Sequence, residues 1–258
     1  MRNTIAIKTH YPGAYFLLSI DNGEWVIRVT NNDEYKISKK EMVQFIRPVL
    51  LNINLSSRRI VKNHLFYLQY NLICLENLRD IHEKIINDLI GNNDTYGSNK
   101  IGAFGYLKCF PPKPVRLKYV RKSNKYPNRF EFISTNKYNK NDSSMITWFD
   151  YKRRFKYFID LPGHSYTTKL YTMLFCKRLV FYIKNDMRFT WERNLKPWVH
   201  YVPVNENLQD LNKKYLWAEK NPDKVKKIVE TAFDYMMNNL HPDLILNKFV
   251  REIEARLG

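Results

Sequence analysis

Near the N-terminus, hydrophobic positions gather in two short runs that are separated by a turn signal. Residues 14–20 and 25–29 are apolar runs, and they flank Asp21, Asn22 and Gly23. An Asn-Gly pair readily adopts the positive φ angles that a tight hairpin turn requires. The start of the chain is therefore predicted to hold a β-hairpin.

The spacing of apolar residues then changes several times before residue 100. After Ser38 it becomes helical, with Met42, Phe45, Ile46 and Leu50 on one face. The rest of this region is predicted as helices at 57–67 and 81–90, a buried strand at 70–75 and a polar, turn-rich loop at 91–100.

The C-terminal half alternates strand and helix patterns. A helical pattern at 166–176 stands between apolar runs that predict strands, at 155–161, 179–183 and 200–204. Asn221 and Pro222 suit the N-cap and first position of a further helix, and another helix is predicted from Pro242. Strand, short turn, helix and strand form a βαβ unit, which indicates an α/β lobe with a parallel sheet.

A proline-rich segment, 110–114, interrupts any helix and is the predicted domain boundary. It divides the chain into an N-terminal lobe, residues 1–110, and a C-terminal lobe, residues 111–258.

Composition narrows the class of protein. The chain has 258 residues, 44% of them hydrophobic, which is enough for a globular core. We expect neither a membrane span nor a signal peptide, because no apolar run has the required length. Cys74, Cys109 and Cys176 are odd in number and widely spaced, so we expect a reducing, cytosolic compartment.

The net charge of +18 indicates a partner that carries negative charge. Nucleic acid, an anionic membrane surface and phosphorylated small molecules all satisfy it, and the charge alone does not choose among them.

The turn after the strand at 155–161 contains side chains that favour a phosphorylated small molecule. Gly163 allows close approach of the backbone, and hydroxyl groups of Ser165, Thr167 and Thr168 lie near the start of a helix. Lys169 adds a full positive charge one turn later. Free amide groups at a helix start favour an anion, so this turn suits a diphosphate, although hydroxyl groups there also serve as ordinary caps.

Two blocks of sequence resemble glycosyltransferase family 90, which includes protein O-glucosyltransferases, capsule-associated xylosyltransferases and lipopolysaccharide glycosyltransferases. The first block is residues 155–181, with Asp-Leu-Pro-Gly-His-Ser-Tyr-Thr-Thr-Lys at its centre. The second is Leu195-Lys-Pro-Trp-Val-His-Tyr-Val-Pro-Val204, and 207–211 follow it.

The resemblance implies a GT-B-like α/β fold of two Rossmann-like lobes, with a reduced N-terminal lobe and a parallel-sheet C-terminal lobe that binds the donor. It also implies inverting transfer of glucose or xylose from a UDP-sugar to a hydroxyl of a glycan or protein, with no cofactor and no metal. The absence of an Asp-x-Asp motif agrees with the last point.

The resemblance also assigns residues to the donor site, which would be Gly163, His164, Ser165, Tyr166, Thr167, Thr168 and Lys169. Relatives have Arg where this chain has Lys169, and Lys supplies the charge without the bidentate fork. The family's second basic group precedes a strand, and Arg116 fits it best, with Lys113 as the alternative.

The catalytic base of the family is an Asp just after a strand in the N-terminal lobe, and Asp80 matches that pattern. Only 36 positions separate Asp80 from Arg116, which requires a large deletion relative to the family. Asp21 is the alternative, although its place in a hairpin turn is the stronger explanation for it.

Two other functions compete with transfer of a sugar. One is nucleic-acid binding, which the charge favours but no recognisable motif supports, so no nucleic acid is expected as a partner. The other is a transferase fold that binds donor or glycan without catalysis. We expect a cytosolic protein, in a host or bacterial cell, that the basic surface could also bring to a membrane.

Overall fold

The computed structural model describes residues 4–8, 15–21, 24–28, 34–37, 85, 87, 95–105, 114–134, 148–162, 169–184, 190–241 and 244. The chain divides into two compact units. The first consists of residues 1–80, 188–194 and 239–258, and the second of residues 81–187 and 195–238.

In the first unit, the described strands β1 (Thr4–Lys8), β2 (Tyr15–Asp21), β3 (Glu24–Arg28) and β4 (Glu34–Ile37) form an antiparallel sheet in chain order. The last pair between β2 and β3 is Asp21 with Glu24, which leaves Asn22 and Gly23 as the connection. The predicted hairpin is confirmed.

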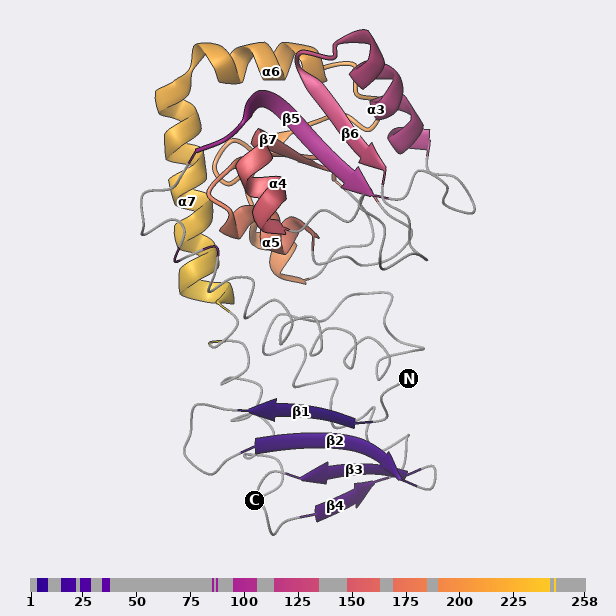
Figure 1. The fold of residues 1–258 in the computed structure, drawn as a ribbon. Helices are drawn as coiled ribbons and strands as arrows, with labels where there is room; N and C mark the ends of the chain where they lie inside the picture. The colour runs from indigo at the N-terminus through magenta and orange to yellow at the C-terminus, as the bar shows by residue number, and fades with distance from the viewer. Residues whose placement is uncertain are drawn as a thin grey trace. The chain divides into compact units, whose positions relative to one another are not determined.

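In the second unit, five described strands form a parallel sheet (Figure 1). Its order is β6-β5-β7-β8-β9, with β5 at Ser98–Gly105, β6 at Phe130–Ser134, β7 at Phe155–Asp160, β8 at Leu179–Tyr182 and β9 at Val202–Pro203. The chain leaves β5 for β6 on one side and returns to β7 on the other side. The strand order therefore reverses between β5 and β7.

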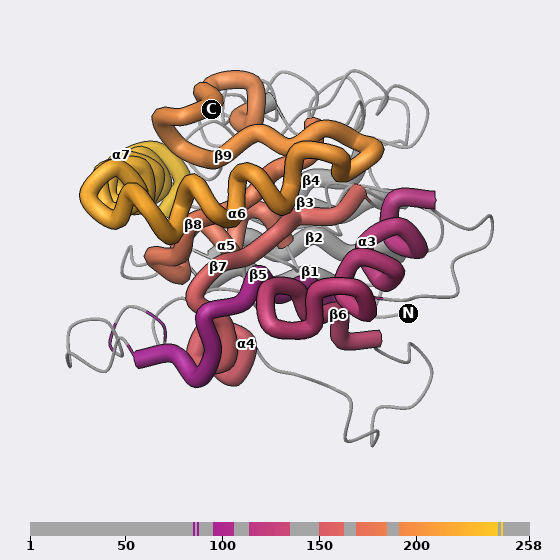
Figure 2. The backbone as a smooth tube through the Cα atoms, turned by 90° about the horizontal axis from the view of Figure 1, so that it is seen from above, coloured from indigo at the N-terminus to yellow at the C-terminus, as the bar shows by residue number. Residues whose placement is uncertain are grey.

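Helices cover both faces of this sheet. The helices α3 (Pro114–Lys125) and α6 (Leu211–Lys220) lie over one face, in front of β5 and β7 in Figure 2. The helices α4 (Trp148–Arg154) and α5 (Lys169–Phe175) lie behind the sheet in that view. The remaining described helices are the long α7 (Pro222–Leu240) and the short η2 (Thr190–Asn194). None of the described helices is long and apolar enough to cross a membrane.

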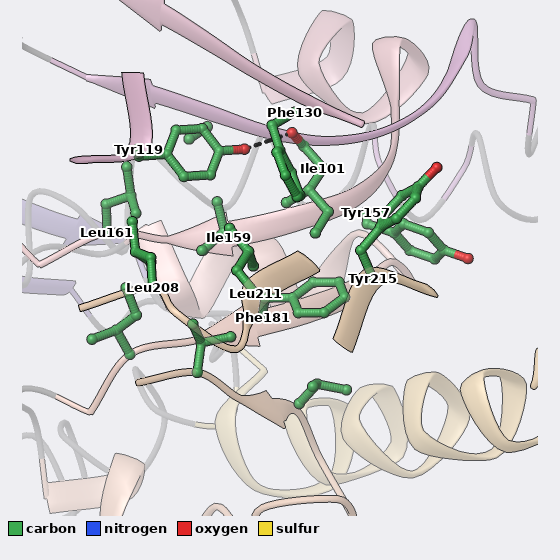
Figure 3. Close-up of a cluster of buried hydrophobic side chains, with 14 of the residues drawn as sticks. Ile101, Tyr119, Phe130, Tyr157, Ile159, Leu161, Phe181, Leu208, Leu211 and Tyr215 are labelled. Carbon is green, nitrogen blue, oxygen red and sulfur yellow. Dashed lines mark hydrogen bonds between the residues drawn. The ribbon is translucent and has the colours of Figure 1, made fainter. Parts of the chain in front are cut away.

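The main hydrophobic core lies between the sheet and the helices α3 and α6 (Figure 3). Ile101 and Ala103 of β5 and Tyr157 and Ile159 of β7 point into it, as expected for alternate residues of a strand. Tyr119 of α3 donates a hydrogen bond from its hydroxyl to the Ile101 carbonyl at 2.6 Å. The polar atom of this buried ring is thereby satisfied.

The α/β class with a parallel-sheet C-terminal lobe, which was expected from the sequence, is confirmed. The strands predicted at 155–161 and 179–183 correspond to β7 and β8, and the helix predicted within 166–176 to α5. The helix predicted to begin at Pro222 is α7. Of the helix predicted at 81–90, the described residues Ile85 and Asn87 are helical.

Strand β5 was not predicted, because its first residues, Ser98 to Lys100, are polar and fall in the expected loop at 91–100. It pairs with β6 and β7, so the parallel sheet begins before the boundary expected at residue 110. The proline-rich segment ends at Pro114, which is the first residue of α3. The other elements predicted before residue 80, and the helix predicted from Pro242 apart from the helical Leu244, lie outside the described residues.

The backbone of β5 at Gly102 has no room for a side chain, so Gly102→Ala should destabilise the parallel-sheet lobe. A Cβ at residue 102 would lie 2.2 Å from a ring carbon of Phe155, which is fully buried. Overpacking of this kind costs about 1–3 kcal/mol in the free energy of unfolding, which urea unfolding would measure. The matched control is Gly97→Ala, because a Cβ there meets its nearest atoms at 3.8 Å. Equal stability of the two variants would contradict this packing.

Candidate functional site

The strand order of the parallel sheet reverses between β5 and β7. Strand β5 ends at Gly105 and β7 ends at Asp160. The chain then leads from β5 to α3 on one face and from β7 to α5 on the other. In open parallel sheets, ligands bind at this position because the two diverging connections leave the strand ends uncovered.

Lys169 reaches this edge from the start of α5. Its Nζ donates a hydrogen bond to the Phe104 carbonyl at 2.7 Å and lies 4.6 Å from the centroid of the Phe104 ring. These contacts hold the ammonium group against the last residues of β5.

Arg116 reaches the same edge from the first turn of α3. Its side chain is only 6% exposed, which is unusual for a guanidinium. A Cβ on Gly105 would lie 3.0 Å from Lys169 Nζ and 3.6 Å from Arg116 Nη1. The two cationic groups therefore converge on Gly105, and the missing side chain gives them room.

Asp160 completes this charged cluster, which we call the Arg116–Lys169–Asp160 cluster. The register of β5 and β7 pairs Gly102 with Phe158, and Asp160 ends β7 two residues further along. Burial raises the pKa of the Asp160 carboxyl from 3.8 to about 6, while Lys169 and Arg116 act in the opposite direction. Both cations therefore act on this carboxylate.

Tyr151 of α4 packs against both β5 and β7 next to the cluster. Its ring stacks on Phe158 at 4.5 Å and meets the Phe104 ring edge-on at 4.7 Å, and its hydroxyl donates to the Gly102 carbonyl. These contacts fix the ends of both strands on the α4 and α5 face.

The arrangement suits a ligand with two adjacent negative charges. Two cations face one carboxylate, and α3 carries no acidic residue in its first turn to neutralise the positive end of its dipole. A diphosphate group would fit this pattern of charge. Among the described residues, no group of three or more His, Cys, Asp or Glu side chains could hold a metal ion.

The structure brings together Arg116 and Lys169, the two basic residues predicted for a donor site. Arg116 does not precede a strand, as the family pattern had suggested, but lies in helix α3. Lys113, Asp80, Gly163, His164, Ser165, Tyr166, Thr167 and Thr168 lie outside the described residues. Asp21 ends β2 opposite Glu24.

Sequence reasoning missed Asp160 and Gly105. The available signal for Asp160 was a carboxylate at the second-last position of the strand predicted at 155–161, shortly before the turn and the predicted anion-binding helix. Gly105 could not be recognised, because the strand that it ends was not predicted.

Residues 77–252 match the family model of Glycosyl transferase family 90. Protein O-glucosyltransferase 1 of Rattus norvegicus is 27% identical over 90 residues, which are 35% of this chain and 23% of that protein. O-glucosyltransferase rumi of Drosophila melanogaster is 27% identical over 89 residues, 34% of this chain and 22% of that protein. Uncharacterized protein 179R of Invertebrate iridescent virus 6 is 30% identical over 101 residues, 36% of this chain and 8% of that protein. The matches thus span less than a quarter of these relatives.

Among solved structures, a glycosyltransferase from Rickettsia africae ESF-5 is similar with a TM-score of 0.44 and 14% identity, over 68% of this chain and 52% of that one. TarM is similar with a TM-score of 0.46 and 11% identity, over 98% of this chain and 79% of that one.

The raised pKa of Asp160 predicts that Asp160→Asn stabilises the protein near neutral pH. The folded pKa of about 6 exceeds the ordinary value of 3.8, so the folded state binds the proton more tightly between these values. Stability of the wild type is therefore lost as pH rises through this window and stays lower above it. The amide avoids that loss, and we expect a gain of about 1–3 kcal/mol at pH 7 to 8 that shrinks towards pH 4.5.

Urea unfolding between pH 4.5 and 8 would measure this gain. Asp223→Asn, at an exposed position in the first turn of α7, is the control and should show no such pH-dependent gain. A variant Asp160→Asn that is less stable than the wild type at every pH would contradict the raised pKa.

Proposed function

The chain belongs to glycosyltransferase family 90, and from that premise we propose that it transfers glucose or xylose from a UDP-sugar to a hydroxyl group of a glycan or protein acceptor. The observation that carries the proposal is the convergence of Arg116 and Lys169 at the carboxyl end of β5. Glucose is the first sugar to test, because the curated relatives include O-glucosyltransferases.

In the proposed reaction, Arg116 and Lys169 hold the diphosphate of the donor. Negative charge builds up on this group as its bond to the sugar breaks, and cations fixed beforehand stabilise it without moving. Because Arg116 is buried, its interaction with the phosphate oxygens is screened less than at an exposed site. The two cations would thus perform the role that a metal ion has in other transferases, and we propose metal-independent transfer.

Inversion at the sugar carbon requires that the acceptor hydroxyl attacks from the side opposite the departing UDP. A carboxylate on that side would accept the proton of the hydroxyl as the new bond forms. We propose Asp80 for this role, with Asp21 as the alternative. Both assignments come from the sequence pattern.

The acceptor and the location are proposed on the basis of composition. The net charge of +18 exceeds what one diphosphate needs, and would draw the protein to an acidic glycan or to the surface of an anionic membrane. We propose a cytosolic enzyme that can make a peripheral membrane contact.

Donor binding should appear as thermal stabilisation by UDP, UDP-glucose or UDP-xylose in the absence of metal. A ligand at 100 times its dissociation constant adds about 2.7 kcal/mol to the free energy of unfolding. Lys169→Ala and Arg116→Ala should lose this stabilisation because each removes a charge that contacts the diphosphate. Lys169→Arg should keep it.

Lys226→Ala removes a lysine whose side chain is 74% exposed on α7, and it should bind the donor as the wild type does. The absence of a shift with any uridine nucleotide, together with salt-sensitive binding of DNA or RNA, would reject the proposed function in favour of nucleic-acid binding.

The base is tested by separating donor binding from transfer. Asp80→Asn should keep the thermal shift with the donor but lower the rate of transfer by about 10²- to 10⁴-fold, because the amide cannot accept a proton. Release of UDP in the presence of acceptor would measure this rate, with Asp21→Asn assayed in parallel. Unchanged transfer by Asp80→Asn and loss in Asp21→Asn would move the assignment to Asp21.

A further inference from the structure

The outer surfaces of α3 and α6 carry an excess of positive charge. These two helices lie over the same face of the sheet, and their buried residues, such as Tyr119 and Tyr215, point towards it (Figure 2). Helix α3 contains five basic residues and no acidic residue. Helix α6 contains three basic residues and one acidic residue, Glu219. The Glu219 carboxylate is already held, because Lys156 pairs with it at 2.9 Å.

Five of these basic side chains are exposed, on the sides of the helices that face away from the sheet. Lys118, Arg121 and Lys125 of α3 are three and four positions apart, so they lie on one side of that helix. Lys213 and Lys220 of α6 are seven positions apart and also share one side. None of the ion pairs between described residues includes any of these five. Their charges are therefore not neutralised within the described part of the chain.

Large hydrophobic side chains are exposed on the same surface. Leu117 of α3 is 39% exposed and Leu216 of α6 is 38% exposed, and each lies one helical turn from one of these basic residues. Trp198 and Val199 are exposed in the segment beside α6. Four of the six exposed large hydrophobic side chains in the described part of the chain thus belong to this surface. Exposed apolar groups that gather on one surface mark an interaction site.

Trp198 is held in its exposed position by the backbone. Its φ angle is +63°, a left-handed conformation that is rare for a bulky residue. Its N–H donates a hydrogen bond to the Tyr201 carbonyl at 2.7 Å, and its ring meets the Trp217 ring of α6 edge-on at 4.9 Å. Lys214 Nζ of α6 lies 5.8 Å from the centroid of the indole. A strained backbone that keeps an indole at the surface beside a cation indicates a function for that indole.

We infer that this surface, the outer side of α3 and α6 together with Trp198 and Val199, binds a membrane that contains anionic lipids. We call it the α3–α6 face. Its lysines and arginine attract the anionic headgroups, and its leucines and indole gain free energy when they leave water for the membrane interface. The inference locates the membrane contact that the proposed function derives from net charge alone, and it does not depend on the donor site.

The two leucines favour a membrane over a nucleic acid as the partner. The phosphates of a nucleic acid would satisfy the positive charges, and an indole can stack on a base. An aliphatic side chain has no such partner along a phosphate backbone. At a membrane interface, by contrast, Leu117 and Leu216 would bury the surface that they now expose to water.

Co-sedimentation of the full chain with vesicles tests the α3–α6 face. The probes are vesicles of phosphatidylcholine with about one third phosphatidylserine, and vesicles of phosphatidylcholine alone. The wild type should bind the first and not the second. The double variant Lys118→Gln and Arg121→Gln should bind about 25-fold more weakly, because each basic residue near an anionic surface contributes about fivefold.

The double variant Lys226→Gln and Lys227→Gln is the matched control, because it removes the same charge from exposed positions of α7. Helix α7 runs away from the α3–α6 face and is seen nearly end-on in Figure 2. This control should bind vesicles as the wild type does. Urea unfolding of both double variants should match the wild type, because glutamine is a good helix former at exposed positions. Equal loss of binding in the two variants would assign the attraction to total charge and overturn the inference.

The double variant Leu117→Gln and Leu216→Gln separates a membrane from a nucleic acid. Each leucine should contribute about three- to sevenfold to vesicle binding, since roughly two fifths of its surface remains to be buried. The variant keeps every charge, so any binding of RNA should be unchanged. Vesicle binding that is unchanged in this variant, or absent in the wild type, would overturn the inference. Because these assays contain no UDP-sugar, failure of the proposed donor site would leave their result intact.

Discussion

The close approach of side chains to strand β5 is the constraint on which the rest of the parallel-sheet lobe depends. At Gly102 the missing side chain makes room for the ring of Phe155, and thus for the packing of β7 against β5. At Gly105 the missing side chain makes room for Lys169 and Arg116. Gly102 therefore allows β7 to pack against β5, and Gly105 leaves room for the two cationic side chains.

The reversal of strand order is the reason why Arg116 and Lys169 reach the same edge of the sheet. Because β5 and β7 continue into helices on opposite faces, Arg116 approaches the edge from one side of the sheet and Lys169 from the other. A single helix could present only one of them in this way. The hydrogen bond from Lys169 to the Phe104 carbonyl fixes the ammonium group at this edge without neutralising it, because a carbonyl carries no net charge.

The elements predicted correctly are those whose own residues carry a clear strand or helix pattern. Strand β8 is an uninterrupted apolar run, and β7 is apolar at four of its six residues. Helix α7 begins with an asparagine cap and a proline at its first position. Helix α3 could not be predicted in this way, since Val115 to Tyr119 alternate apolar and polar residues as a strand does. Tertiary packing decides there, because Val115 and Tyr119 lie one helical turn apart and are buried, whereas Leu117 is exposed.

The same distinction explains what could be predicted of the candidate site. Lys169 and Arg116 were predicted from the family resemblance, and for Lys169 also from its place at a helix start. Asp160 required the fold, because only the register of β5 and β7 and the convergence of two helices bring a carboxylate beside both cations. Net charge was the weakest guide. An exposed charge such as that of Lys226 is solvated and screened, whereas the buried Arg116 acts over short distances in a medium of low dielectric constant. If the proposed donor site is correct, its affinity for an anion depends more on buried groups such as Arg116 than on the total of +18.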